Sequence, residues 1–298
     1  MVMGSCASLQ GGAALATQLF PHAGSWGVTF LRLLFAGLLL VAFIPIRKVM
    51  GWNKEQWVPV TMFGLSLGLM NGFFYAAIAR IPLGIAVTIE FLGPLLLSAA
   101  LSRKLTDFLW VALACSGLVL LGVDSYRAAD GSASLDPLGI VFALIAGAFW
   151  VGYILLSKRV GAAMPGTAGL TVALFVGAAA LAPLGALHVG GILTSPALIG
   201  LAFATAFLAS VLPYTLELAA LRQLPPAIFG ILLSLEPVFA ALAGWLLLGQ
   251  QLGLIPLVAI AFVVSASIGT TVSNRPRPLG SPKPIRQRLT RLRIPRQK

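Results

Sequence analysis

Charged residues are scarce in this chain: they make up 9% of its 298 residues, and only eight of them are acidic. A soluble domain of this size needs far more polar surface, so the composition excludes a water-soluble globular protein. The apolar residues form continuous runs of about 16–22 positions, whereas strands of a membrane barrel alternate apolar and polar residues over about ten. The sequence therefore predicts an all-α, polytopic membrane protein.

Cysteine and histidine are also rare, with two of each. Cys6 and Cys115 fall within apolar runs, which argues against a disulfide framework or a metal site. His22 and His188 are expected in outer loops, and no aspartate lies in the middle of an apolar run. An intramembrane enzyme would need a metal set, a Ser/His pair or paired aspartates there, so the sequence disfavours an enzyme and predicts no cofactor.

Ten apolar segments are long enough to be membrane spans. They are residues 4–20, 26–44, 57–78, 83–101, 106–122, 137–157, 167–187, 197–219, 227–248 and 254–273. The longest connection, 123–136, separates two groups of five, and an odd number of spans inverts the second group relative to the first. We therefore expect two inverted five-helix repeats, residues 1–122 and 137–273, joined by a periplasmic loop. Because the first run starts almost at Met1, we expect preceding residues to complete its helix.

The positions of the 20 basic residues predict the orientation of these spans. If both termini are cytoplasmic, eight basic residues in loops and nine at the C-terminal end lie inside. Only Arg80 and Arg127 lie outside, and Arg32 lies within a span. An excess of Lys and Arg in cytoplasmic loops is the usual bias of membrane proteins, so both termini are expected in the cytoplasm.

The last 25 residues, 274–298, form a strongly basic segment. They contain nine Lys or Arg, five prolines and no acidic residue. This composition predicts a disordered cytoplasmic tail. Directly after a last span, such a tail is expected beside anionic lipid, and contact with nucleic acid is the less favoured alternative.

One apolar motif occurs twice. Residues 82–94, PLGIAVTIEFLGP, place two prolines twelve positions apart with a glutamate between them. Residues 225–237, PPAIFGILLSLEP, repeat this arrangement, and both copies follow an arginine, Arg80 and Arg222. A duplicated membrane helix with an internal glutamate is typical of secondary transporters, which have two halves around a central polar site.

Several segments resemble the EamA-type transporters of the drug/metabolite transporter superfamily. They are SLQGGAALATQLFP (8–21), GVTFLRLLFAG (27–37), GLSLGLMNGFFYAAIARIPLGIAVTIEFLGPL (64–95), FWVGYILLSKRVG (149–161) and LPYTLELAALRQLPPAIFGILLSLEPVFAALAGWLLLGQ (212–250). The resemblance implies alternating access between two halves, and it is strongest to bacterial inner-membrane exporters of threonine and homoserine. Gln250 departs from the family pattern, because many EamA repeats carry glutamate there.

The resemblance leaves other functions open. Exporters of other metabolites or drugs share the superfamily, and a non-transporting membrane protein is a more distant alternative. Nucleotide-sugar carriers would need several cations in the cavity, whereas only Arg32 lies within a span. No ATP-binding motif is present, so an ion gradient is expected to drive transport, and the glutamates within the spans favour protons over sodium.

Four charged residues lie within the predicted spans: Arg32, Glu90, Glu217 and Glu236. A charge inside the bilayer is costly unless it is paired or faces a water-filled cavity, so each is a functional candidate. Glu90 and Glu236 precede prolines that free a carbonyl and let the helix bend. These two could bind a substrate ammonium or a proton, or act as structural hydrogen-bond hubs. Arg32 could bind a substrate carboxylate or pair with a glutamate or carbonyls, and Glu217 could reach the interface.

Uncharged polar residues complete the predicted substrate site. Asn71 and Tyr75 are four positions apart, so they share one face of their helix. Gln10 lies in the first span, and Trp150 and Tyr153 lie in the sixth. A small amino acid needs an ammonium acceptor, donors for its carboxylate and a small pocket, which this set could supply. Each of these residues could instead serve helix packing.

Overall fold

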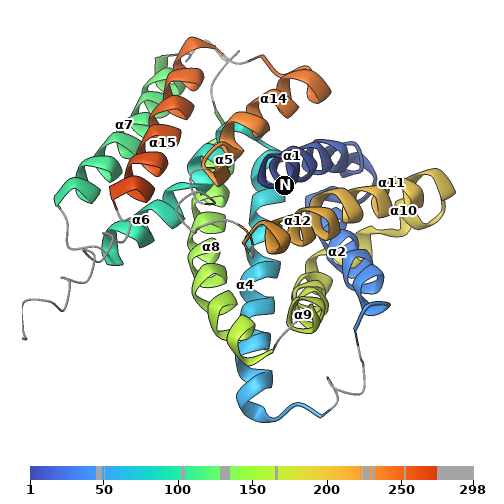
Figure 1. Ribbon diagram of the computed structural model, residues 1–298. Helices are drawn as coiled ribbons and strands as arrows, with labels where there is room; N and C mark the ends of the chain where they lie inside the picture. Colours follow the sequence, from blue (N-terminus) through green and yellow to red (C-terminus); the bar gives the residue numbers. More distant parts are fainter. Residues whose placement is uncertain are drawn as a thin grey trace, which may run out of the picture.

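A computed structural model of the chain describes residues 1–44, 49, 51–101, 105–127, 135–164, 167–221, 223, 229, 232–251 and 253–273. All regular elements in these ranges are helical (Figure 1), which confirms the all-α prediction. They are α1 (Val2–Thr17), α2 (Phe20–Val41), α4 (Lys54–Ile78), α5 (Leu83–Glu90), α6 (Leu92–Leu101), α7 (Leu105–Arg127), α8 (Pro137–Ala163), α9 (Ala168–Gly185), η1 (Ala186–His188), α10 (Gly190–Leu193), α11 (Pro196–Ala206), the π-helical η2 (Phe207–Val211), α12 (Leu212–Leu221), α14 (Glu236–Leu248) and α15 (Leu254–Ser273).

Six helical stretches in the described part of the chain are long and apolar enough to cross a membrane. They are Phe20–Val41, Lys54–Ile78, Pro137–Gly161, Ala168–His188, Pro196–Glu217 and Leu254–Ser273. Leu83–Leu97, Phe108–Leu120 and Glu236–Leu248 are apolar but shorter. The predicted tail, 274–298, and part of the second copy of the repeated motif, 225–228, 230 and 231, lie outside the described residues.

The fourth predicted span, 83–101, is not one continuous helix. It divides at Phe91 into α5 and α6. Pro94 lacks the N–H that would bond to the Glu90 carbonyl, so the helical ladder is interrupted there. Gly147 of α8 packs against this break, and a methyl group on it would lie 2.7 Å from the Glu90 carbonyl oxygen. The break places the Glu90 side chain at the end of a helix.

A second irregularity lies in the eighth predicted span, where α11 passes through η2 into α12. Pro213 lacks an N–H, and it lies four residues after Ala209 and five after Leu208. Neither carbonyl can therefore receive a helical hydrogen bond from Pro213. Side chains supply the missing donors: Ser8 Oγ donates to Leu208 O at 2.7 Å, and Arg32 Nη1 donates to Ala209 O at 3.0 Å.

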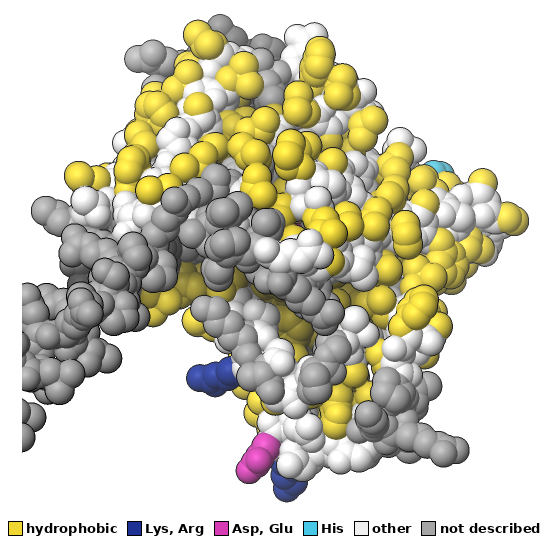
Figure 2. Space-filling model, in the orientation of Figure 1, with side chains coloured by type: hydrophobic (Ala, Val, Ile, Leu, Met, Phe, Trp, Pro, Cys, Tyr) yellow, Lys and Arg dark blue, Asp and Glu magenta, His cyan; other side chains and the backbone are white. Residues whose placement is uncertain are grey.

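The helices form one bundle (Figure 1). In its centre α4 packs along α8 and α9, and α9 also packs along α2. At one side α7 pairs with α15, while α1 lies between α14 and the segment from α11 to α12. Figure 2 shows hydrophobic side chains over much of the face drawn; among the residues drawn in colour, charged ones are visible near its lower end. An apolar surface of this kind is expected of helices surrounded by lipid.

Candidate functional site

Arg32 is the centre of a buried polar cluster. Its side chain comes from α2 and is 2% exposed. Nη1 donates to Ala209 O in η2, Nη2 donates to the Asn71 amide oxygen of α4, and the guanidinium carbon lies 4.5 Å from the centre of the Tyr75 ring. Asn71 Nδ2 in turn donates to Leu67 O at 2.7 Å. Arg32 thus contacts two other predicted site residues, Asn71 and Tyr75, and links α2, α4 and η2.

The two glutamates beside prolines lie at helix ends and near each other. Glu90 is the last residue of α5 and Glu236 the first of α14; they are 8% and 6% exposed and lie within electrostatic range of each other. Gln10 of α1 donates through Nε2 to Glu236 Oε1 at 2.9 Å. Glu90 also lies within electrostatic range of Arg32. The structure therefore brings one buried guanidinium and two buried glutamate carboxyl groups into the same region.

Tyr214 is a residue of this region that the sequence analysis missed. It follows Pro213 at the start of α12, and its hydroxyl lies within electrostatic range of Arg32, Glu217 and Glu236 and near the Asn71 side chain. Glu217, three residues further along, accepts a hydrogen bond from Ser5 Oγ at 2.7 Å. Pro213 was the signal in the sequence that could have identified Tyr214. A proline within a span makes the nearby backbone irregular, and polar side chains often lie beside such backbone.

Trp150 and Tyr153 of α8 contact aromatic rings. Trp150 meets Phe91 edge-on with ring centres 4.8 Å apart, and Tyr153 stacks on Phe63 at 5.1 Å. Tyr153 also lies within electrostatic range of Tyr214 and Glu217. The structure thus places Tyr153 beside the α12 end of the polar region, and Trp150 against the break between α5 and α6.

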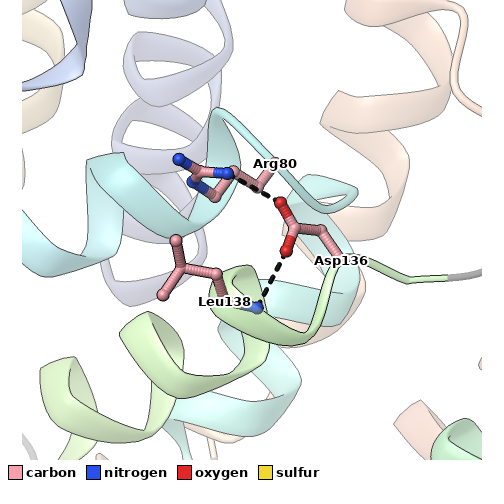
Figure 3. A network of polar contacts seen from close by, with 3 residues as sticks. All are labelled: Arg80, Asp136 and Leu138. Atoms are coloured by element: carbon pink, nitrogen blue, oxygen red, sulfur yellow. Dashed lines mark hydrogen bonds and ion pairs between the residues drawn. The ribbon is translucent and has the colours of Figure 1, made fainter.

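An ion pair joins the end of α4 to the start of α8. Arg80 Nη1 donates to Asp136 Oδ2 at 2.8 Å, while Asp136 Oδ1 accepts the backbone N–H of Leu138 (Figure 3). The two side chains are 42% and 34% exposed. The hydrogen bond from Arg80, and then that from Leu138, lower the pKa of Asp136 below its usual value. The pair therefore connects the first predicted repeat to the last residue of the connecting loop, directly before the second repeat.

This lowered pKa predicts a pH-dependent contribution to stability. A carboxyl with a lowered folded-state pKa stabilises the fold above its ordinary pKa, and this stabilisation is lost as the pH falls through the lowered value. Asp136→Asn keeps a helix-capping oxygen but removes the charge. We expect this variant to melt at a lower temperature than the wild type at about pH 7, with the difference closing as the pH falls below 3.8, the ordinary pKa of an aspartate. Melting curves of the purified protein measure this, and a difference independent of pH would contradict it.

A groove of about 750 Å³ lies between α14 and α15. Its lining is mostly apolar and includes Val238, Leu242, Trp245, Leu257, Ile260 and Val264. None of the predicted site residues lines it.

The polar region holds a guanidinium and two carboxyl groups close to one another. Arg32 presents donors to an anion, and Glu90 and Glu236 present acceptors to a cation or a proton. Among the described residues, no group of three or more His, Cys, Asp or Glu could hold a metal ion. The arrangement suits a small zwitterion.

Comparison with known proteins gives the family. The EamA-like transporter family matches residues 137–272. The threonine/homoserine exporter RhtA of Escherichia coli K12 is 42% identical over 269 residues, covering 90% of this chain and 89% of its own length. The chain belongs to the EamA-like transporter family. An EamA-like protein is a transporter, so the exclusion of an enzyme is confirmed.

Other relatives agree with this EamA-like assignment. RhtA of Salmonella typhimurium LT2 is 42% identical, covering 91% of this chain and 90% of its own. The uncharacterized transporter YwfM of Bacillus subtilis 168 is 28% identical, covering 74% and 75%. A solved crystal structure with 22% identity covers 92% of this chain and 96% of its own, with a TM-score of 0.58. At that identity the likeness concerns the fold alone.

Proposed function

We propose that this protein exports small amino acids such as threonine and homoserine across the bacterial inner membrane. The observation that carries the proposal is the 42% identity over 90% of the chain to exporters of these two amino acids. The site supports it, because an amino acid carries an ammonium and a carboxylate, and the buried region holds Arg32 together with Glu90 and Glu236.

In this proposal Arg32 receives the substrate carboxylate, and Glu90 accepts its ammonium. Glu90 and Glu236 also exchange protons, so that a proton gradient drives export. Asn71 and Tyr75 hold Arg32 in place, while Gln10 orients Glu236, as their contacts indicate. Trp150 and Tyr153 shape the pocket on the side of α8.

We further propose that the chain consists of two inverted five-helix repeats, residues 1–122 and 137–273, which rock about the buried site. Helix packing supports this symmetry. Three contacts join elements from equivalent spans: α2 with α9, α5 with α14, and α7 with α15. The contact of α4 with α8 joins the third and sixth predicted spans. Its counterpart under the symmetry joins the eighth and first, and α1 does pack on the segment from α11 to α12. A structure trapped open to the opposite side tests this, because each repeat should then move as a unit.

Both termini are proposed to lie in the cytoplasm, with residues 123–136 in the periplasm. The distribution of basic residues supports this orientation. Residues 274–298 would then lie beside anionic lipid, where their nine cations are attracted to the membrane surface.

Growth under inhibitory amino acid tests the proposed function. Cells that express this protein should tolerate concentrations of threonine or homoserine that stop control cells, and should release labelled threonine faster. A panel of other amino acids and drugs under the same conditions measures the substrate range. Protection against drugs without protection against threonine or homoserine would contradict the proposal and favour a drug exporter.

Among the glutamates, Glu90 is expected to matter more for transport than Glu217. Glu90→Gln should reduce threonine efflux to near background, because a buried amide can neither exchange a proton nor neutralise an ammonium. Glu217 is only half-buried and bonded to Ser5, so Glu217→Gln should retain most of the activity. Efflux from cells with matched amounts of inserted protein measures both. Wild-type efflux in Glu90→Gln would remove this residue from the mechanism.

A further inference from the structure

Four buried polar atoms in the described part of the chain have no hydrogen-bond partner. They are Gln10 Oε1, Arg32 Nε, Tyr75 OH and Ser210 Oγ. Their side chains are only 1–2% exposed. Buried polar atoms in native proteins are almost always paired, so four unpaired atoms require an explanation. A ligand that binds in this part of the bundle would provide one.

The four atoms come from elements that meet at one place. Arg32 of α2 bonds to the Ala209 carbonyl, next to Ser210, and lies over the ring of Tyr75 in α4. Helix α1 crosses η2 at Gly12, where a methyl group would come within 2.7 Å of the Ala209 backbone nitrogen. Gln10 faces the other side of α1, where it bonds to Glu236 of α14, and both Glu236 and Arg32 lie within electrostatic range of Tyr214. The four atoms therefore belong to one polar region around Arg32 and Glu236, to which α1, α2, α4, η2 and α14 contribute.

The chemistry of the four atoms matches a particular class of substrate. Arg32 Nε can only donate a hydrogen bond, which suits a carboxylate, and Gln10 Oε1 can only accept one, which suits an ammonium. The hydroxyls of Ser210 and Tyr75 can do both, which suits a third group that is itself a hydroxyl. A hydroxy amino acid carries all three groups. An aliphatic amino acid would leave the hydroxyls unpaired.

Of the two residues with an unpaired hydroxyl, Tyr75 and Ser210, the local backbone favours Ser210 as the substrate contact. The Tyr75 ring is held beneath the Arg32 guanidinium and against Phe20. Ser210 lies in the π-helical turn η2, a type of irregularity that is frequent at functional sites. The Leu208 and Ala209 carbonyls of this turn accept hydrogen bonds from Ser8 and Arg32, whereas the Ser210 hydroxyl has no hydrogen-bond partner. Ser210 is therefore the stronger candidate for a contact with substrate.

We propose that Ser210 is the residue that selects hydroxy amino acids, by hydrogen bonding to the side-chain hydroxyl of the substrate. The proposal rests on the proposed export of amino acids and adds the group that determines specificity. Threonine and valine have nearly the same shape and differ by this hydroxyl. A site that hydrogen-bonds a substrate hydroxyl discriminates strongly against the analogue without it, because its own polar group is then left unpaired.

The test uses the purified full-length protein in liposomes, with labelled threonine and valine measured in parallel. The wild type should transport threonine over valine by at least about tenfold, and Ser210→Ala should reduce that ratio by about tenfold. The control is Ser8→Ala, since Ser8 bonds to the same π turn but is already paired with Leu208 O. It should slow both substrates alike and leave the ratio unchanged.

Two outcomes would overturn the assignment. One is an unchanged ratio in Ser210→Ala. The other is a ratio lost in Tyr75→Phe but kept in Ser210→Ala, which would move the contact to Tyr75. If Ser210→Ala does not insert, Ser210→Cys replaces it, because a thiol is a weak donor and the ratio must still fall. A wild type that transports neither threonine nor homoserine would overturn the proposed function itself, which distinguishes the two failures.

Discussion

Arg32→Lys is expected to lower threonine transport by about 10–100-fold, although the charge is kept. The guanidinium reaches acceptors on two different elements, Ala209 O and Asn71 Oδ1, and covers the Tyr75 ring as well. A lysine ammonium is a compact point charge and cannot reproduce this planar fork. At least one buried acceptor would be left unpaired, at a cost of about 1–3 kcal/mol. Initial rates of transport in liposomes measure the loss.

The matched control is Arg80→Lys. Arg80 also pairs with an oxygen and lies near an aromatic ring, that of Phe142, but it is 42% exposed. Water can replace contacts that are lost at such a position, so this variant should transport at close to the wild-type rate. Equal rates for Arg32→Lys and the wild type would show that the buried cluster is not part of the transport cycle. Melting curves with and without threonine separate a loss of binding from a loss of folding.

Under the proposed function Arg32 both links helices and binds the substrate carboxylate, and the two roles use different atoms. Nη1 and Nη2 bond to the protein, whereas Nε has no partner. In the proposed function, a carboxylate that binds at Nε would therefore leave the bond from Nη1 to the Ala209 carbonyl in place.

Much of the polar region follows from rules that act within one helix. Asn71 and Tyr75 share a face because they are four residues apart, and the structure finds both at Arg32. The cost of burying a charge in the bilayer identified Arg32, Glu90 and Glu236 as candidates, and all three are buried. Sequence reasoning succeeds here because spacing and burial cost do not depend on which helices are neighbours.

The contacts between helices could not be predicted in the same way. In the sequence, Pro213 indicates only that the backbone near Ser210 and Tyr214 is irregular. The π-helical form of η2, and the neighbours of these two residues, are known only from the structure. That Arg32 bonds to the carbonyl of Ala209 depends on how α2 crosses the eighth span, and the spacing of residues within one helix does not determine that crossing. Likewise, the break at Phe91 follows from Pro94, but its packing against Gly147 is a tertiary contact.

Gly147→Ala is expected to destabilise the bundle and abolish most of its transport. The added methyl group would lie 2.7 Å from the Glu90 carbonyl oxygen, so α8 and the break between α5 and α6 must move apart. Overpacking of this kind costs about 1–3 kcal/mol. It also displaces Glu90, which lies at that break. The yield of folded protein, its melting temperature and threonine efflux should therefore all fall.

Gly161→Ala provides the control within the same helix. Gly161 belongs to α8, and an added methyl group there would meet no atom within 4 Å. Replacing a helical glycine by alanine without a clash is neutral or stabilising, by up to about 1 kcal/mol. The two substitutions are chemically identical, so opposite effects on melting temperature would isolate the contact between Gly147 and Glu90. If Gly147→Ala melts and transports like Gly161→Ala, α8 does not pack against the break in the way that the structure shows, and the position assigned to Glu90 must be revised.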